Sequence, residues 1–216
     1  KDHVIVASTG VIGEYLPMDK MEPGIKEAAT LLSREGGADA AEAILTTDTT
    51  TKEFAVKFLL GGKEVMIGGM AKGSGMIHPN MATMLAFITT DACVEPQALD
   101  IALRWAVNRS FNAITVDGDT STNDMVVVLA NGQVDSNPLS ESDPEYVFFR
   151  EALLAVCTEL AKMIARDGEG ASKFLEVRVK GAACEEDARI IARSIAASSL
   201  VKTAISGEDA NRGRVL

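Results

Sequence analysis

The sequence has little that would suit it to binding nucleic acid. Lysine and arginine total 21 against 31 aspartate and glutamate residues, which gives a formal net charge of -10. Affinity for nucleic acid depends largely on Lys and Arg side chains that neutralise phosphates, and the sequence contains no Lys/Arg cluster. We therefore expect no nucleic-acid partner, although one well-placed cation would be enough to hold a small anionic substrate.

Cysteines are few and long apolar runs are absent. Cys93, Cys157 and Cys184 lie far apart, and no CxxC pair or Cys/His cluster accompanies them. This spacing argues against a disulfide framework or a zinc site and favours free thiols in a reducing compartment. Neither a signal peptide nor an apolar run long enough to cross a bilayer is recognisable. We therefore expect a cytoplasmic protein without a membrane partner.

Aromatic residues make up only 5% of the chain, whereas glycine and alanine are frequent. The hydrophobic fraction of 47% and the charged fraction of 24% are those of an ordinary globular protein. A chain of 216 residues is long enough to bury a hydrophobic core. We interpret the small residues as a sign of close backbone packing.

Hydrophobic periodicity predicts strands and helices in mixed order. Strands are expected at residues 3–8, 53–60, 63–67, 83–90, 125–130 and 174–179. Helices are expected at residues 23–34, 96–111 and 185–201, and the best-patterned helix opens at Asp143-Pro144 and stops at Gly168. The pair Gly61-Gly62 indicates a hairpin turn between two of the strands. Together these elements predict an α+β fold in which sheet packs on sheet and helices lie outside.

Residues 68–85, GGMAKGSGMIHPNMATML, combine many small residues with one lysine and a threonine before a predicted strand. On composition alone, a flexible loop between strands is the simplest interpretation. A Walker phosphate loop fits poorly because Lys72 precedes Gly73. A third interpretation is a self-cleaving nucleophile. Cutting the Ala82–Thr83 bond would give Thr83 a free α-amine with a pKa of about 7.7–8.0, able to take the proton of its hydroxyl.

Six segments in order along nearly the whole chain form a pattern. They are residues 8–13 (STGVIG), 46–49 (TTDT), 72–77 with 79–85 (KGSGMI and PNMATML), 117–124 (DGDTSTND), 167–171 (DGEGA) and 207–211 (GEDAN). The pattern resembles the ornithine acetyltransferase family, also called glutamate N-acetyltransferase or ArgJ-type. The third segment is similar to the processing site of that family.

The resemblance implies a self-processing enzyme of arginine biosynthesis. It would transfer an acetyl group from N-acetylornithine to glutamate by a ping-pong mechanism, after cleavage between Ala82 and Thr83. Residues 1–82 would be the C-terminal part of an α chain and residues 83–216 the N-terminal part of a β chain. They would form one structural unit, truncated at both ends, of an α2β2 heterotetramer. The implied fold is the layered αββα sandwich of the self-processing ArgJ/DmpA-like type.

The catalytic residues implied by the resemblance are Thr83, Thr9 and Gly10. Thr83 Oγ would form an acetyl-enzyme, while the Thr9 hydroxyl and the Gly10 backbone N–H would stabilise the oxyanion. A glycine lets the backbone come close to the reacting atom, and a hydroxyl can rotate to donate. Without the family, Thr9-Gly10 would be interpreted as a turn that ends a strand.

The substrate contacts implied by the resemblance are Thr49, Lys72, Thr83 and Glu169. Lys72 would hold a carboxylate, which both substrates carry, and the carboxylate of Glu169 suits a substrate amine. Each residue also has a simpler interpretation. A lone lysine is usually solvated, Thr49 could simply lead into a strand, and Glu169 could belong to a turn after a helix.

No metal or cofactor is expected. Asp117, Asp119 and Asp124 do not fit the EF-hand pattern, which requires Glu at its twelfth position, and we interpret them as turn and strand-entry residues. His78 precedes a proline in a loop and is given no catalytic role. Some family members accept acetyl-CoA as a donor, which makes it a candidate substrate of this protein.

The sequence departs from the family in two respects. It lacks the long N-terminal and C-terminal parts, including the C-terminal Asn and Ser/Thr substrate contacts, and Arg212 stands where the family has Trp in N-W-G-R. Two alternatives therefore stay open. One is a self-processing amidohydrolase or aminopeptidase of related fold, and the other is an inactive fragment of the acetyltransferase.

Overall fold

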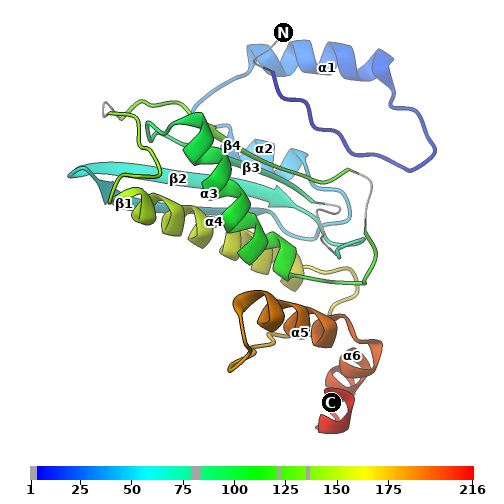
Figure 1. Ribbon diagram of the computed structural model, residues 1–216. Helices are drawn as coiled ribbons and strands as arrows, with labels where there is room; N and C mark the ends of the chain where they lie inside the picture. Colours follow the sequence, from blue (N-terminus) through cyan, green and yellow to red (C-terminus); the bar gives the residue numbers. More distant parts are fainter. Residues whose placement is uncertain (1–3, 79–83, 121–122, 135–136) are drawn as a thin grey trace.

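The computed structural model describes residues 4–78, 84–120, 123–134 and 137–216. At its centre is a four-stranded sheet in the order β1-β2-β3-β4 (Figure 1). The strands are β1 (Lys52–Leu60), β2 (Lys63–Lys72), β3 (Leu85–Thr90) and β4 (Met125–Ala130). The sheet is mixed: β2 pairs antiparallel with both β1 and β3, and β4 pairs parallel with β3.

The connections follow from local sequence. Gly61 and Gly62 have φ angles of 58° and 75°, which the tight turn between β1 and β2 requires. A parallel pair of strands needs a crossover, and α3 (Pro96–Arg109) supplies it between β3 and β4. Pro96 suits the first turn of α3 because its missing N–H would have no partner there.

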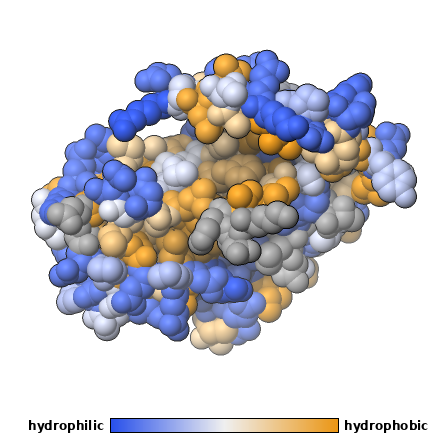
Figure 2. All heavy atoms as spheres, turned by 90° about the horizontal axis from the view of Figure 1, so that it is seen from above, coloured by the Kyte–Doolittle hydropathy of each residue, from blue (hydrophilic) through white to orange (hydrophobic). Residues whose placement is uncertain are grey.

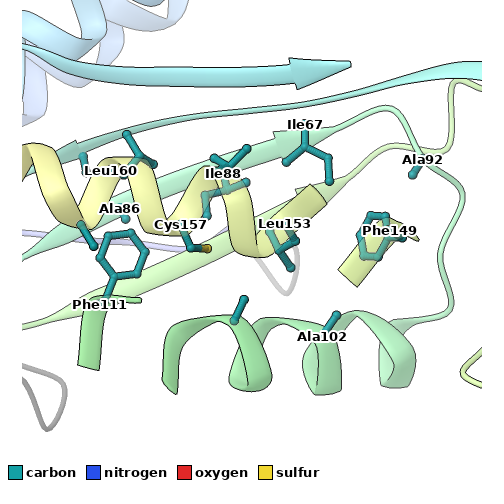
Figure 3. Packing of buried hydrophobic residues seen from close by; sticks show 14 of the residues in the cluster. Ile67, Ala86, Ile88, Ala92, Ala102, Phe111, Phe149, Leu153, Cys157 and Leu160 are labelled. Atoms are coloured by element: carbon teal, nitrogen blue, oxygen red, sulfur yellow. The ribbon is translucent and has the colours of Figure 1, made fainter. Parts of the chain in front are cut away.

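The hydrophobic core lies between the sheet and two helices, α3 and α4 (Tyr146–Arg166). Every second residue of β1 faces α4. A stripe of buried side chains on α4, which includes Phe149, Leu153 and Leu160, packs against the sheet (Figure 3). The helix comes close to the sheet at Gly69. A Cβ atom there would lie 3.2 Å from Leu160 Cδ1 and 3.1 Å from the carbonyl oxygen of Phe87.

The remaining elements are helical. They are α1 (Met18–Thr30), α2 (Gly37–Ala43), η1 (Phe111–Ala113), α5 (Glu185–Ala197), α6 (Ser199–Ser206) and η2 (Arg212–Arg214). One of them, η1, contributes Phe111 to this core. In Figure 1, α1 lies beyond one side of the sheet, and α5 and α6 lie below the opposite side. Figure 2, seen from above, shows hydrophobic side chains gathered in the middle of the visible face. No helix among the described residues is long and apolar enough to cross a membrane.

The α+β class predicted from the sequence is confirmed. The described strands all belong to one sheet, so the described residues do not form the second sheet of the sandwich. Two predicted strands are wrong. Residues 4–8 and 174–179 have no regular structure, although Leu175, Val177 and Val179 keep the expected alternation of burial. Alternating side chains make a strand only where a neighbouring strand supplies hydrogen bonds, and neither segment has one in the part of the chain described.

Several predicted boundaries also change. The first helix runs over Met18–Thr30 instead of 23–34, and the last predicted helix is divided at Ser198 into α5 and α6. Strand β2 continues to Lys72, five residues beyond its expected end, because its glycine-rich half pairs with β3 through Ala71 and Ala86. Residues 68–72 of the supposed loop are therefore part of a strand.

Candidate active site

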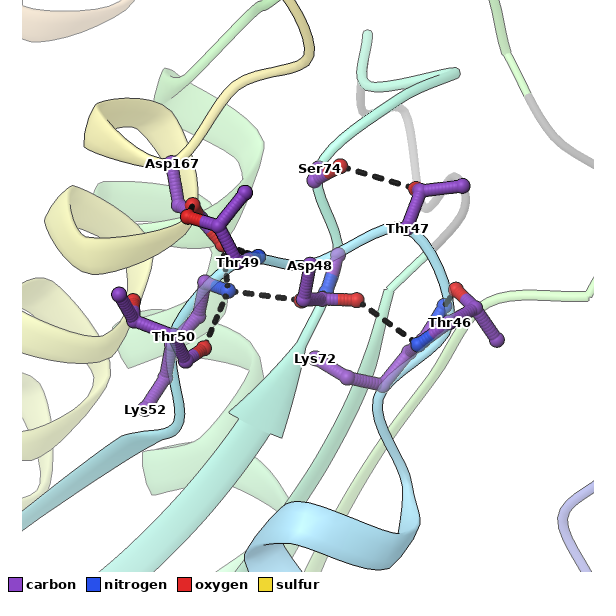
Figure 4. A network of polar contacts seen from close by, with 10 residues as sticks. Thr46, Thr47, Asp48, Thr49, Thr50, Lys52, Lys72, Ser74 and Asp167 are labelled. Atoms are coloured by element: carbon purple, nitrogen blue, oxygen red, sulfur yellow. Dashed lines mark hydrogen bonds and ion pairs between the residues drawn. The ribbon is translucent and has the colours of Figure 1, made fainter.

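Three segments that are distant in sequence meet at one end of the β1–β2 hairpin (Figure 4). They are residues 46–52, residues 72–75 and residues 167–169. The first two come together because Lys52 at the start of β1 pairs with Ala71 near the end of β2. The third follows the C-terminal end of α4, which packs on both strands. Three of the six segments singled out in the sequence thus form one polar cluster.

Asp48 is the first organising group of this cluster. Its carboxylate accepts hydrogen bonds from the Gly73 N–H at 2.6 Å and the Thr46 N–H at 3.2 Å, and it contacts Lys52 Nζ at 2.7 Å. Burial acts to raise the pKa of Asp48, but the bonds from Gly73, Lys52 and Thr46 outweigh it and hold the pKa below its ordinary value. Asp48 is therefore a carboxylate that fixes the backbone of two segments.

Asp167 is the second organising group. It accepts from Lys52 Nζ at 2.6 Å, from the Thr49 N–H at 2.9 Å and from the Thr49 hydroxyl. Burial acts to raise the pKa of Asp167 as well, and the bonds from Lys52 and Thr49 more than offset it, so the pKa is lowered. Thr49 is thus tied to the end of α4 by both its backbone and its side chain.

The cluster contains two buried lysines, Lys52 and Lys72, and only 3% of the surface of Lys72 is exposed. Its Nζ donates to Thr46 Oγ1 at 2.7 Å, and no carboxylate among the described residues forms an ion pair with it. Burial lowers the pKa of Lys72, the charge of Asp48 acts to raise it, and the charge of Lys52 acts to lower it. A buried ammonium without a direct counter-ion is costly, and an anionic ligand would supply the missing charge.

The turn after Lys72 connects this cation to Glu169. Ser74 Oγ lies 2.9 Å from Thr47 Oγ1, and the Ser74 carbonyl oxygen accepts from the Glu169 N–H at 2.8 Å. The exposed side chain of Glu169 lies against Gly75, where an added Cβ would collide with Glu169 Oε2. The structure therefore brings Thr49, Lys72 and Glu169, the three described substrate-contact candidates, to the same cluster.

The predicted oxyanion residues lie elsewhere in the described chain. Thr9 and Gly10 belong to an N-terminal segment without regular structure, and no hydrogen bond of the described residues joins them to the cluster. The neighbouring Ser8 carbonyl oxygen accepts from Asn123 Nδ2 at 2.9 Å. The predicted cleavage residues, Ala82 and Thr83, lie outside the described residues.

Asp117 and Asp124 accept hydrogen bonds from residues on either side of the predicted cleavage site. Asp117 accepts from the Ile77 N–H at 3.0 Å, and Asp124 Oδ1 accepts from the Met84 N–H at 2.6 Å. Burial raises the pKa of Asp124 to about 6 despite the bond from Met84, and Asp124 Oδ2 has no partner in the described structure. The sequence alone predicts turn and strand-entry roles for both aspartates. The spacing within DGDTSTND does not reveal their contacts, because the donors Ile77 and Met84 each lie 40 residues away in the sequence.

The fold is α+β, with a largely buried cluster of charged and hydroxyl side chains at one end of its β1–β2 hairpin. No group of three or more His, Cys, Asp or Glu side chains among the described residues is arranged to hold a metal. The model of the ArgJ family matches residues 1–216, and the chain belongs to this family.

Named relatives agree with this assignment. The arginine biosynthesis bifunctional protein ArgJ of Symbiobacterium thermophilum is 64% identical over 211 residues, which are 98% of this chain and 52% of the relative. The protein of the same name from Oceanobacillus iheyensis is 60% identical over 215 residues, or 99% of this chain and 52% of the relative. The chain thus spans about half the length of the curated relatives it matches.

A solved structure supports the fold. The crystal structure of the arginine biosynthesis bifunctional protein ArgJ from Bacillus halodurans matches with a TM-score of 0.58 and 53% sequence identity. The match covers 60% of this chain and 61% of the crystallised one.

Proposed function

We propose that the protein transfers an acetyl group from N-acetylornithine to glutamate, with Thr83 as the nucleophile. The observation that carries this proposal is Lys72, a buried ammonium without a carboxylate partner among the described residues, in a chain of the ArgJ family. Both proposed substrates carry a carboxylate that could pair with it. The names of the relatives place those proteins in arginine biosynthesis.

The proposed reaction begins with self-cleavage, in which a water molecule hydrolyses the peptide bond between Ala82 and Thr83 and leaves a carboxylate on Ala82 and a free α-amine on Thr83. The new α-amine of Thr83 then accepts the proton of its own hydroxyl. Thr83 Oγ attacks the acetyl carbonyl of N-acetylornithine, the C–N bond breaks, and ornithine leaves with the proton. In the second half, the amine of glutamate attacks the acetyl ester, N-acetylglutamate forms, and the hydroxyl of Thr83 is restored. The Thr9 hydroxyl and Gly10 N–H would donate to the oxyanion in both halves.

The polar cluster is proposed to bind the substrates. Lys72 would pair with the carboxylate, Thr49 would contribute a hydroxyl beside it, and Glu169 would attract the substrate amine. The exposure of Glu169 leaves its carboxylate accessible for this role. We further propose an α2β2 assembly, a cytoplasmic location, no cofactor, and acetyl-CoA as an additional donor substrate.

Mass spectrometry of the purified protein tests the nucleophile. We expect two fragments that divide between Ala82 and Thr83, and N-acetylornithine should acetylate the fragment that begins at Thr83. Addition of glutamate should remove the acetyl group and yield N-acetylglutamate. Thr83→Ala should abolish cleavage and acetylation, whereas Thr83→Ser should keep some cleavage because it keeps a hydroxyl.

The same experiment separates the alternatives. Release of free acetate without N-acetylglutamate would identify a hydrolase of related fold. A protein that stays uncut and is not acetylated would refute the proposed activity for this chain. Cleavage that persists in Thr83→Ala would exclude Thr83 as the nucleophile.

A further inference from the structure

Lys52 is a second buried lysine, and the proposed reaction gives it no role. None of its surface is exposed, and its three ammonium protons have three acceptors: Asp48 Oδ1 at 2.7 Å, Asp167 Oδ2 at 2.6 Å and the Thr50 carbonyl oxygen at 3.1 Å. It is therefore fully occupied and cannot itself hold a ligand. Its contacts instead connect the two carboxylates that organise the polar cluster.

The position of Lys52 in the sheet is unusual for a charged residue. Strand alternation places it in the same row as Phe54, Val56 and Phe58, which pack against the core. An apolar side chain would suit this row without the cost of removing an ammonium from water. Buried ion pairs stabilise proteins weakly compared with apolar packing, so the stability of the sheet alone does not explain a lysine here.

The contacts of Lys52 lead to the candidate substrate residues by two short routes. Through Asp48, it fixes the Thr46 N–H and the Gly73 N–H, and the Thr46 hydroxyl accepts from Lys72 Nζ. Through Asp167, it fixes the N–H and hydroxyl of Thr49. Figure 4 shows Lys52 between Asp48 and Asp167, with Thr46 and Lys72 on the far side of Asp48.

Charge balance also favours this role. The cluster contains two buried carboxylates, of Asp48 and Asp167, and two buried ammonium groups. Both carboxylates contact Lys52, and neither forms an ion pair with Lys72. If Lys52 were absent, Asp48 and Asp167 would each lack a cation, and Lys72 would be the nearest alternative for Asp48. By occupying both carboxylates, Lys52 leaves the ammonium of Lys72 available for a ligand.

We propose that Lys52 is a positioning residue of the carboxylate-binding site, which holds residues 46–49 and 72–74 in place and keeps Lys72 free of an internal ion pair. The proposal rests on the proposed function insofar as the ligand of Lys72 is a substrate carboxylate. The ordering of the two segments does not depend on that function and can be measured separately.

The test uses three variants of the purified protein. Asp48→Asn/Lys52→Met removes one buried charge of each sign, so the remaining buried charges stay balanced. Asp167→Asn is milder, because it leaves the Lys52–Asp48 pair intact, and it carries the test if the double variant does not fold. Lys57→Met is the matched control, since Lys57 lies on the same strand in an exposed pair with Glu64.

Two readouts are compared after thermal melting has shown that each variant folds. The first is amide hydrogen exchange at Thr46, Thr49 and Gly73, whose N–H groups donate to the two carboxylates. The second is the dissociation constant for glutamate, measured by titration calorimetry. A hydrogen bond from a charged group to a ligand contributes roughly 10- to 100-fold to affinity, and a misplaced Lys72 would lose it.

We expect faster exchange at all three amides in the double variant and at Thr49 in Asp167→Asn, by about tenfold or more. Glutamate should bind roughly 10- to 100-fold more weakly to both, whereas Lys57→Met should match the original protein. Unchanged exchange, or faster exchange with unchanged glutamate affinity in a folded variant, would overturn the proposal. Failure of the unsubstituted protein to bind glutamate would instead count against the proposed function, and hydrogen exchange would still decide whether Lys52 orders the segments.

Discussion

Replacing Lys72 with methionine should weaken ligand binding without weakening the fold. The side chain is buried, and its ammonium has one neutral hydrogen-bond partner, Thr46 Oγ1, among the described residues. Methionine fills a similar volume and carries no charge to desolvate. The substitution therefore removes an unfavourable burial of charge from the folded state and an ion pair from the ligand complex.

The magnitudes follow from these contacts. A hydrogen bond to a charged group contributes about 1.5–3 kcal/mol, so Lys72→Met should weaken glutamate binding about 10- to 150-fold. The free energy of unfolding should stay unchanged or rise by up to about 2 kcal/mol. The equally buried Lys52 gives the opposite expectation, because Lys52→Met leaves two carboxylates unpaired and should cost about 3–5 kcal/mol.

The pH dependence of stability supplies a further test of Lys72. Burial lowers its pKa below the ordinary 10.5, so the unfolded chain binds the proton more tightly than the folded protein. Stability from this group should therefore rise as the pH increases from the folded-state pKa towards 10.5. Lys72→Met should lack this rise.

Titration calorimetry with glutamate and urea denaturation at several pH values measure these quantities. Lys57→Met, on the exposed side of the hairpin, serves as the control and should leave glutamate affinity unchanged. A loss of several kcal/mol in Lys72→Met would show that the ammonium supports the fold. Unchanged glutamate affinity in a stable variant would refute its role as the carboxylate site.

Three further predictions concern the core and the processing segment. Asp124→Asn should stabilise the protein above pH 6 and have little effect below pH 4, because burial raises the pKa of Asp124 from 3.8 to about 6 and makes its charged form the costly one. The full shift corresponds to roughly 3 kcal/mol, and solvent screening of this partly exposed carboxyl reduces the expected gain to about 1 kcal/mol. Urea denaturation between pH 4 and pH 7 measures the gain. Gly69→Ala should cost about 1–3 kcal/mol, since its Cβ would press on the Phe87 carbonyl oxygen and Leu160; an unchanged melting temperature would contradict the close approach of α4. Leu153→Ala should cost about 2–5 kcal/mol, whereas the same change at the exposed Leu59 should cost much less in parallel melts.

Much of the fold could be predicted because its determinants are local. The alternation of β1, the Gly61-Gly62 turn and the long apolar stripe of α4 each lie within one stretch of sequence. The predictions fail where structure depends on a distant partner. Residues 174–179 alternate like a strand but pair with no strand in the described part of the chain, whereas the second half of β2 looks like a loop because glycines interrupt its alternation.

The candidate site shows the same limit. The resemblance brought attention to Thr49, Lys72 and Glu169, and the structure brings them together, but their substrate contacts stay predictions. Sequence spacing gave no reason to single out Lys52. Its partner Asp48 lies four residues away, as in many surface pairs, and its other partner Asp167 is 115 residues distant. Only the packing of α4 on the sheet reveals that this lysine is buried between them.

The long separation of Lys52 and Asp167 has a consequence for the order of folding. The β1–β2 hairpin can form from neighbouring residues, but the contact that completes the polar cluster must wait until α4 has docked. Contacts between residues so far apart in sequence form slowly, because a large loop must close first. The cluster around Lys72 is therefore completed only once most of the chain has folded. Any chemistry that depends on it is withheld from the nascent and partly folded chain.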